Sequence, residues 1–376
     1  MKRVLYLFTS GRGERINSSE LGNAPRDFLY GYTYLREQGL AVDYLETDHI
    51  TPAKHTLEYW KLFYRNKRFA RQLSIGSRSH YFVSKLEKLN SYDAIIATTD
   101  SIALGLAYFK HHNRLRSEIM YLSMGLAGAL KQLKQSDKEL FDKYKDRCGR
   151  DLRQCRVVWT AGKGEEQFLT SEYQEFKSKF FYSPWGIDLQ FWKPNTSLIN
   201  KEKYVLFVGN DNNRDFSQLL AISRERPNIQ FIFVTSKIKG SDCGKNVLLH
   251  QGTLTNHFLS DTELRKLYNN ASLIILPLKE SLQPSGQSVS LQAMACARPV
   301  AITKTSGLWD STLMRNNENC FLVTPGVRDF LEIIDELDRG ENKFSGIGLK
   351  ARQIVLKHHD GADFSAWING IIQNYY

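Results

Sequence analysis

The chain of 376 residues is 42% hydrophobic and 24% charged, a balance that argues against a disordered or low-complexity protein. No apolar run approaches the roughly 18 residues of a membrane span, and the first residues are not expected to form a secretory signal. The five cysteines form no CxxC pair, so we expect a cytoplasmic protein. Residues 1–195 carry 31 basic against 22 acidic side chains and residues 196–376 carry 20 against 18, so an anionic partner or a solvated basic face is expected in the first half.

The first half of the chain alternates short β-rich runs with longer helical stretches. Residues 11–15, GRGER, follow the first run and are predicted to form a loop. Strands separated by helices of this length predict parallel strands joined by right-handed crossovers. The predicted strands are residues 2–9, 42–46, 92–99, 119–124 and 156–161, and the predicted helices are residues 25–38, 55–73 and 101–112, with helical patterning up to about residue 146.

The alternation breaks near residue 183 and then restarts. Residues 182–194, YSPWGIDLQFWKP, predict a domain junction because they combine two prolines with a glycine. We therefore expect an α/β fold of two doubly wound Rossmann-like domains, residues 1–194 and 203–360, that face a central cleft at the carboxyl ends of their strands. The second domain has predicted strands at residues 203–209, 228–235, 246–252, 272–278 and 298–303, and predicted helices at 215–225, 261–270, 288–297 and from 328 to the end.

The turn at residues 284–288, PSGQS, is the most specific feature of the second half. It opens a helix, whose exposed N–H groups and positive dipole end suit an anion such as a diphosphate. Gly286 would let the anion approach the backbone closely, and Gln292, one helical turn past Ser288, can face the same ligand. A serine-capped corner without a ligand is the alternative interpretation.

Residues 276–303, which contain this turn, resemble the signature of the family 4 glycosyltransferases (glycosyl transferases group 1). These are retaining enzymes of the GT-B fold. Other segments resemble the family in matching order over nearly the whole chain, namely residues 158–169, 182–194, 205–222 and 317–337.

The resemblance implies transfer of a sugar from a nucleoside diphosphate donor, UDP- or GDP-linked, to an acceptor hydroxyl. The C-terminal domain would bind the donor and the N-terminal domain the acceptor, such as a glycolipid or a cell-surface glycan precursor. The last helix, residues 361–376, would pack back on the N-terminal domain. No metal ion or other cofactor is implied, because basic side chains and a helix N-terminus neutralise the leaving diphosphate.

Residue roles also follow from the resemblance. Arg214 would contact the diphosphate with help from Asn210, Glu280 or Gln283 would bind hydroxyls of the donor sugar, Gln292 would bind the ribose, and Leu254 would lie against the base. The family's two glutamates fall on Gln283 and Gln292, and Ser123-Met124-Gly125 replaces a common histidine, so the donor sugar is not specified. The implied donor-binding residues are Gly209, Asn210, Arg214, Leu254, Glu280, Gln283, Ser285, Gly286, Gln287, Ser288 and Gln292.

Two features of the first half could also belong to a site. The glycines of Ser10-Gly11-Arg12-Gly13 would allow a close approach to donor or acceptor, although a simple turn explains them equally well. Asp100 ends a predicted strand and could orient or deprotonate an acceptor hydroxyl, alongside Arg214 and Glu280 as candidate catalytic groups. The alternative for Asp100 is a cap on the following helix.

Residues 56–73 predict a basic, aromatic, amphipathic helix. Such a helix suits an anionic membrane surface or an acidic acceptor, unless its aromatic face is simply core. The candidate residues are Trp60, Lys61, Arg65, Lys67, Arg68 and Arg71. The histidine clusters at 111–112 and 358–359 are interpreted as surface residues rather than metal ligands, and Cys296 as a buried hydrophobe.

These features together predict a metal-independent retaining glycosyltransferase, cytoplasmic or peripheral on the inner face of a membrane. Two alternatives stay open. A sugar-nucleotide epimerase or a sugar phosphorylase can share the architecture, and the basic first half could belong to a nucleic-acid-binding module, the less favoured of the partners considered.

Overall fold

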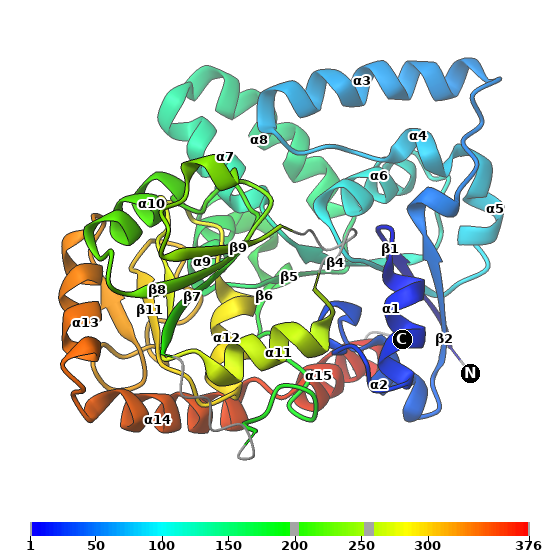
Figure 1. Cartoon of the computed structure of the whole chain (residues 1–376). Coiled ribbons are helices and arrows are strands. Elements are labelled where there is room, and N and C mark those ends of the chain that lie inside the picture. Colours follow the sequence, from blue (N-terminus) through cyan, green and yellow to red (C-terminus); the bar gives the residue numbers. More distant parts are fainter. Residues whose placement is uncertain (1, 196–202, 252–258, 375–376) are drawn as a thin grey trace. The chain divides into compact units, whose positions relative to one another are not determined.

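The chain folds into two compact units (Figure 1). The structure, a computed structural model, describes residues 2–195, 203–251 and 259–374. Unit 1 comprises Met1–Ile16, Phe28–Pro184 and Phe364–Tyr376, and unit 2 comprises Asn17–Asp27 and Trp185–Asp363. Each unit is therefore assembled from separated stretches of the sequence.

Unit 1 is built on a six-stranded parallel sheet with the strand order β2-β1-β3-β4-β5-β6. Its strands are β1 (Arg3–Phe8), β2 (Ala41–Glu46), β3 (Ala94–Ala97), β4 (Glu118–Ser123), β5 (Val157–Thr160) and β6 (Phe180–Tyr182). Its helices are α2 (Tyr32–Glu37), η2 (Thr47–His49), α3 (Leu57–Leu73), α4 (Ser79–Phe82), η3 (Val83–Lys85), α5 (Leu86–Leu89), α6 (Asp100–His111), α7 (Leu126–Ser136), α8 (Lys138–Arg153), α9 (Lys163–Glu172) and η4 (Gln174–Lys179). The chain passes from one unit to the other at four points, one between Pro184 and Trp185 and the others within α1 (Arg12–Glu20), η1 (Asp27–Leu29) and α15 (Gly361–Asn374).

Unit 2 is built on a second six-stranded parallel sheet, with the order β12-β11-β10-β7-β8-β9. Its strands are β7 (Tyr204–Val208), β8 (Gln230–Val234), β9 (Val247–His250), β10 (Leu273–Leu276), β11 (Val300–Thr303) and β12 (Phe321–Val323). Its helices are α10 (Phe216–Glu225), η5 (Gly240–Asp242), α11 (Asp261–Asn270), α12 (Gln287–Ala295), α13 (Arg328–Asp338) and α14 (Lys343–His358).

Four of the inner strands are buried along their whole length. Every residue of β3 (AIIA), β5 (VVWT), β10 (LIIL) and β11 (VAIT) is buried. Continuous apolar runs of this kind belong to parallel strands that are covered on both faces. The two parallel α/β sheets confirm the fold class predicted from the sequence.

The strand order of each sheet reverses at one place. In unit 2 the reversal lies between the paired strands β7 and β10, and in unit 1 it lies between β1 and β3. Open α/β sheets bind their ligands at the carboxyl ends of the strands beside such a reversal. The loops that follow β7 and β10 are therefore the expected site in unit 2.

All the strands predicted from the sequence are present, and two more were not foreseen. β6 and β12 are three residues long and lie at the edges of their sheets. Three residues are too few to show a periodic pattern, so the sequence could not mark them as strands.

The predicted loop at residues 11–15 is wrong, because helix α1 begins at Arg12. Its sequence, RGERINSSE, has no apolar stripe that would predict a helix. A distant residue stabilises its first turn, since the carboxylate of Glu46 accepts hydrogen bonds from the N–H groups of Arg12 and Gly13. Gly13 and Glu46 are 33 positions apart, so the local sequence could not reveal this cap.

The continuous helix predicted at residues 25–38 is also wrong. The segment forms η1 and α2, separated at Tyr30 and Gly31, whose φ angles are 49° and 86°. A Cβ at Gly31 would lie 2.8 Å from Oγ of Ser365 on α15. The break therefore places bare backbone against the last helix of the chain.

The last helix, α15, contributes to unit 1 from Phe364 onward. The ring of Phe364 packs on that of Trp159 with their centroids 5.3 Å apart, and the amide of Asn369 bonds to Gln38. Phe364 is 3% exposed, so this end of the chain completes the core of unit 1.

Helix α12, which begins beside the strand-order reversal of unit 2, lies against α14 (Figure 1). A Cβ at Gly348 on α14 would lie only 2.3 Å from the carbonyl oxygen of Ala297, just beyond α12. Gly346, on the same helix, has no atom of the described residues within 4 Å of its Cβ position. The close contact between α14 and the end of α12 thus requires glycine, which has no side chain, at position 348.

Gly348→Ala is expected to lower the free energy of unfolding by about 1–3 kcal/mol, because α14 must move away from Ala297. Gly346→Ala is the matched control and is expected to raise it by about 0.5–1 kcal/mol, because alanine is the better helix former. Urea denaturation of the two variants measures both effects. Equal stability of the variants would contradict the close packing of α14.

Candidate functional site

Two loops meet at the carboxyl ends of β7 and β10. The N–H of Asp215 donates to the carbonyl of Pro277 (2.9 Å), and the N–H of Lys279 donates to the carbonyl of Asn213 (2.8 Å). Arg214 and Leu278 form an antiparallel bridge between these bonds. The backbone around Arg214 is therefore fixed by both strands that flank the reversal in strand order.

The side chain of Arg214 is buried against two glycines. It is 3% exposed, and a Cβ would lie 2.3 Å from its Nε if added at Gly209 and 2.8 Å from its Nη1 if added at Gly286. Any side chain at either position would displace the guanidinium. Gly209, Arg214 and Gly286 thus lie together, and their role toward a donor stays a prediction.

The charge of Arg214 is only partly compensated. Its Nε lies 3.0 Å from Oδ2 of Asp211, and within the described residues its Nη1 has no hydrogen-bond partner. Burial lowers the pKa of Arg214, and the Asp211 carboxylate opposes that effect. A buried cation with an unpaired N–H is costly unless an anion or another acceptor reaches it, so this corner is suited to bind an anion.

Helix α12 begins at the same corner. Gly286 precedes it with a φ of +83°, a conformation that favours glycine, and the first turn starts at Gln287, which is buried, and Ser288, which is half-buried. The N–H groups of a first helical turn carry partial positive charge and lack partners within the helix. Arg214 and the start of α12 thus provide two sources of positive potential in one place.

Asn213 joins the two loops and was not singled out from the sequence. Its Nδ2 donates to Oε1 of Gln283 (3.0 Å) and to Oγ of Ser285 (2.8 Å). Two predicted donor residues are thereby fixed beside the start of α12. Asn213 precedes Arg214 directly, but nothing in the sequence shows that residues 70 and 72 positions further on are its partners.

Two other predicted donor residues hold neighbouring loops. Oδ1 of Asn210 accepts from the N–H of Ser236 (2.7 Å) and from the hydroxyl of Thr235 (3.1 Å), which connects the ends of β7 and β8. Glu280 is exposed, and its carboxylate accepts from the N–H of Ser306 (3.1 Å) in the loop after β11. Leu254, predicted to contact the base, lies outside the described residues.

Comparisons with known proteins agree with this architecture. Residues 202–338 match the family model described as glycosyl transferases group 1. Alr3699/HepE of Anabaena, solved in complex with UDP-glucose, is 15% identical, with 100% of each chain covered and a TM-score of 0.68. Sucrose-phosphate synthase of Thermosynechococcus elongatus is 16% identical, with 100% of this chain and 99% of that chain covered and a TM-score of 0.71. The chain has the GT-B fold.

The resemblance to group 1 glycosyltransferases that the sequence suggested is thereby confirmed for the segment that forms most of unit 2 of this GT-B chain. A glycosyltransferase of Rickettsia africae is also similar, with 11% identity over 99% of this chain and 97% of that chain and a TM-score of 0.63. No curated protein matches the chain in sequence.

Gln292, on α12 of the GT-B C-terminal unit, is buried and bonded at both ends of its amide. Its Nε2 donates to Oδ2 of Asp27 (2.9 Å), and its Oε1 accepts from the hydroxyl of Tyr268 (3.3 Å). Asp27 also accepts from Nε1 of Trp192 (2.7 Å) and from the N–H of Asp188 (2.6 Å). A buried network therefore fixes the side chain that was predicted to bind the ribose.

The buried network makes the stability of the fold depend on pH. Asp27 is 3% exposed, and burial raises its pKa from 3.8 to about 6, more than its hydrogen bonds lower it. An acid whose pKa is higher in the folded state binds protons more tightly there. Its contribution to stability is therefore present at low pH and is lost as the pH rises through 6.

The turn at Gly11 and Gly13, a predicted binding site of unit 1, contacts a side chain of the protein itself. Gly11, with a φ of +81°, precedes α1, and the N–H of Gly13 donates to Glu46 (2.8 Å). The amides of this turn thus bind a carboxylate of the chain itself. A donor or acceptor contact of Gly11 and Gly13 stays a prediction.

Asp100 is buried and bonded within unit 1. Its Oδ1 accepts from the N–H of Met124 (3.0 Å) and from the hydroxyl of Tyr121. Asp100 is the first residue of α6, but its carboxylate bonds to the backbone just before α7. Burial raises the pKa of Asp100 and also that of the nearby, fully buried Glu165. Proton transfer by Asp100 to an acceptor stays a prediction.

Within the described ranges, no group of three or more His, Cys, Asp or Glu side chains is placed to hold a metal ion. One histidine differs from its interpretation as a surface residue. His359 is 1% exposed, its Nδ1 lies 2.9 Å from the carbonyl oxygen of Trp185, and burial lowers its pKa to about 4. Cys296 is buried, as expected.

Asp27→Asn removes the titrating group of the buried network. The unfolding free energy of the wild-type chain, minus that of the variant, is expected to fall by up to about 3 kcal/mol between pH 4 and pH 7, because only the wild type loses a proton there. Urea denaturation at several pH values measures the difference. Asp338→Asn, which removes an exposed carboxylate on α13, controls for the change in net charge. A difference that stays constant over this range would contradict the assignment.

Proposed function

We propose that the protein transfers a sugar from a nucleoside diphosphate donor to an acceptor hydroxyl. The observation that carries this proposal is the buried guanidinium of Arg214 beside the first turn of α12, which is incompletely paired within the part of the chain that the structure describes. The group 1 family match covers this corner, and the similar Anabaena protein was solved with UDP-glucose. The donor would accordingly be UDP-linked or GDP-linked.

In this proposal the diphosphate lies at the start of α12. Arg214 and the N–H groups of the first turn would stabilise the negative charge that grows on the diphosphate as the sugar departs. Asn213 would keep Gln283 and Ser285 in position, and these side chains with Glu280 would bind hydroxyls of the sugar. Fixed positive groups can do this without a metal ion or other cofactor.

Transfer would proceed with retention, as the family 4 resemblance implies. The acceptor hydroxyl attacks the sugar carbon from the face that the diphosphate leaves, and a leaving-group oxygen takes the proton. One glycosidic bond forms as one sugar–phosphate bond breaks. A new glycoside would distinguish this reaction from epimerisation, which returns an isomeric nucleotide sugar, and from phosphorolysis, which yields a sugar phosphate.

Arg214→Ala is expected to lower turnover of a UDP- or GDP-sugar by about 10²–10³-fold, the effect of removing one stabilising donor from a developing anion. The measurement is release of nucleoside diphosphate, with binding of UDP and GDP followed by calorimetry. Arg224→Ala, which removes an exposed arginine from α10, is the matched control. Unchanged turnover by a folded Arg214→Ala variant would refute the diphosphate role.

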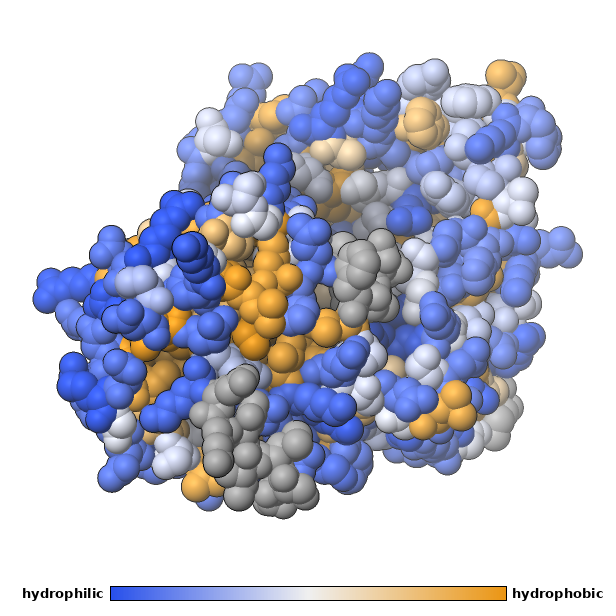
Figure 2. Space-filling model, in the orientation of Figure 1, coloured by the Kyte–Doolittle hydropathy of each residue, from blue (hydrophilic) through white to orange (hydrophobic). Residues whose placement is uncertain are grey.

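We further propose that helix α3 binds an anionic surface, either of a membrane or of an acidic acceptor. Its inward face is Tyr59, Leu62, Asn66, Phe69 and Leu73, which are buried. Trp60 is 43% and Tyr64 63% exposed, with their rings 6.2 Å apart. Figure 2 shows hydrophilic residues along this helix, at the top of the view. We define the α3 patch as Trp60, Lys61, Tyr64, Lys67, Arg68 and Arg71, which are all exposed.

Arg65 is not part of the patch, because its guanidinium stacks 4.2 Å from the ring centroid of Tyr108. Exposed aromatic rings next to lysine and arginine suit the headgroup region of an anionic bilayer. None of the helices in the described parts of the chain is long and apolar enough to cross a bilayer. The proposed association is therefore peripheral.

Replacing Lys61, Lys67, Arg68 and Arg71 by Gln is expected to reduce binding to vesicles of phosphatidylcholine and phosphatidylglycerol by at least tenfold, since each basic residue near such a surface contributes about 1 kcal/mol. Co-sedimentation measures the bound fraction. Lys138→Gln with Lys143→Gln, on the neighbouring helix α8, controls for lost charge. Equal binding of all forms would refute a membrane role. Tight, salt-dependent binding of RNA or DNA instead would favour the nucleic-acid alternative.

A further inference from the structure

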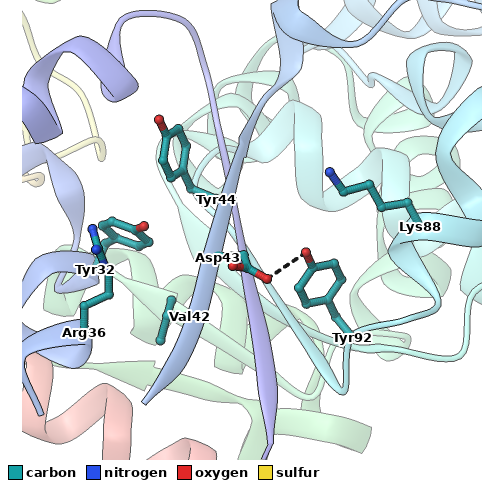
Figure 3. A pocket seen from close by; sticks show the side chains of 7 residues that line it. All are labelled: Tyr32, Arg36, Val42, Asp43, Tyr44, Lys88 and Tyr92. Carbon is teal, nitrogen blue, oxygen red and sulfur yellow. Dashed lines mark hydrogen bonds between the residues drawn. The ribbon is translucent and has the colours of Figure 1, made fainter. Parts of the chain in front are cut away.

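A pocket of about 460 Å³ lies at strand β2, the edge of the unit 1 sheet, but the strand divides it (Figure 3). Tyr44 lies on one side of β2 and Lys88 on the other, so one small ligand cannot contact both. Oδ2 of Asp43 is engaged, because it accepts from the hydroxyl of Tyr92 (2.9 Å) and lies 3.5 Å from Nη2 of Arg3. The carboxyl ends of the strands, where open α/β sheets bind their ligands, are therefore the expected place for a site in unit 1.

Arg78 reaches across these carboxyl ends. Its N–H donates to the carbonyl of Ser101 (2.7 Å), in the first turn of α6, which follows β3. Its Nη1 donates to Oγ1 of Thr47 (2.9 Å), directly after β2. β1 lies between β2 and β3 in the sheet, and the strand order reverses between β1 and β3. The side chain of Arg78 therefore extends past the end of β1, at the reversal in strand order of unit 1.

Helix α6 has a glycine where the backbone of Arg78 packs. A Cβ at Gly105 would lie 2.8 Å from the backbone nitrogen of Ser79 and 3.0 Å from the carbonyl carbon of Arg78. Any side chain at position 105 would displace the chain there, because α4 lies directly against α6 (Figure 1). Thr47, which binds the guanidinium, is fully buried. Buried parts of unit 1 therefore fix both the backbone of Arg78 and the end of its side chain.

No carboxylate of the described residues forms an ion pair with Arg78. Besides Thr47, its guanidinium contacts the ring of Tyr81, whose centroid lies 5.6 Å from Cζ. Glu46, which precedes Thr47, instead accepts from N–H groups at the start of α1. Burial lowers the pKa of His80 to about 4, and the charge of Arg78 adds to that effect, so this histidine is neutral near pH 7. Arg78 is half-buried, and its remaining N–H groups can therefore meet an anion.

Hydroxyl groups follow the two strands beside the reversal. Thr9, which is half-buried, and Ser10, which is exposed, follow β1. Thr99 and Ser101 follow β3, are half-buried, and have their hydroxyls 3.3 Å apart. Carboxylates and phosphates can accept two N–H bonds from one guanidinium. An arginine beside hydroxyl groups therefore suits a polar ligand that carries one of these anions.

We infer that Arg78 binds a carboxylate or a phosphate group of the acceptor, close to the hydroxyl that receives the sugar. The inference rests on the proposed function, because it names the chemical class of the acceptor in that reaction. The competing interpretation is an arginine that only joins the start of α4 to η2. An arginine of that kind would affect stability, whereas a binding arginine makes the protein discriminate between anionic and neutral acceptors.

The test is calorimetric binding of three sugars to the full-length protein. They are methyl glucuronide, which carries a carboxylate, glucose 6-phosphate, and neutral methyl glucoside. One of the two anionic sugars is expected to bind at least about tenfold more tightly than methyl glucoside, and which of them does so identifies the anion. Arg78→Ala should weaken its binding by about tenfold or more, and Arg78→Lys, which keeps the charge, should weaken it less. Arg116→Ala, which removes an exposed arginine ahead of β4, should leave binding unchanged.

Three results would overturn the inference. They are anionic sugars that bind no more tightly than the neutral one, equal binding by the wild type and Arg78→Ala, and loss of that binding in Arg214→Ala but not in Arg78→Ala. The third would place the anion at the start of α12. Binding of UDP or GDP is measured separately, and it should be kept in Arg78→Ala and lost in Arg214→Ala. A failed acceptor test with intact nucleotide binding would leave the proposed transfer reaction standing, and the converse result would leave an anion site at Arg78 without that reaction.

Discussion

The enclosure of one arginine by two glycines is the constraint on which the proposed site depends. Arg214 reaches its buried position because Gly209 and Gly286 present bare backbone to its guanidinium. One glycine directly follows β7 and the other directly precedes α12, so two elements distant in sequence approach the same side chain. A positive charge is thereby held beside a helix start, and water is largely kept from it. Such a preorganised charge is stronger than the same charge on a surface loop.

Side-chain hydrogen bonds also fix the loops that surround Arg214. Asn213 ties the first loop to Gln283 and Ser285, Asn210 ties it to the end of β8, and Glu280 ties the second loop to Ser306. Polar residues near a turn, which the sequence alone does not distinguish, therefore have different structural roles. Some face the corner, and others keep the loops that form it in register.

The sequence was informative where its signal is local and poor where partners are distant. Apolar runs predicted β1 and β10, and the PSGQS turn predicted the start of α12, because strand burial and helix initiation depend on neighbouring residues. Helix α1 was missed because Glu46 caps it from the end of β2. The bond of the Gln292 amide to Asp27, 265 positions away, could not be foreseen, and the ribose contact of Gln292 stays a prediction. Spacing alone cannot tell a ligand-binding amide from one that stabilises a core.

The segment 17–27 has a consequence for the order in which the chain can fold. Asp27 belongs to unit 2, but its partners Trp192 and Gln292 emerge from the ribosome 165 and 265 residues later. Unit 1 in turn acquires its segment from Phe364 onward only after residues 185–363 of unit 2 have been made. Segment 17–27 therefore cannot pack into unit 2 until at least Gln292 has been synthesised, and unit 1 is completed later still.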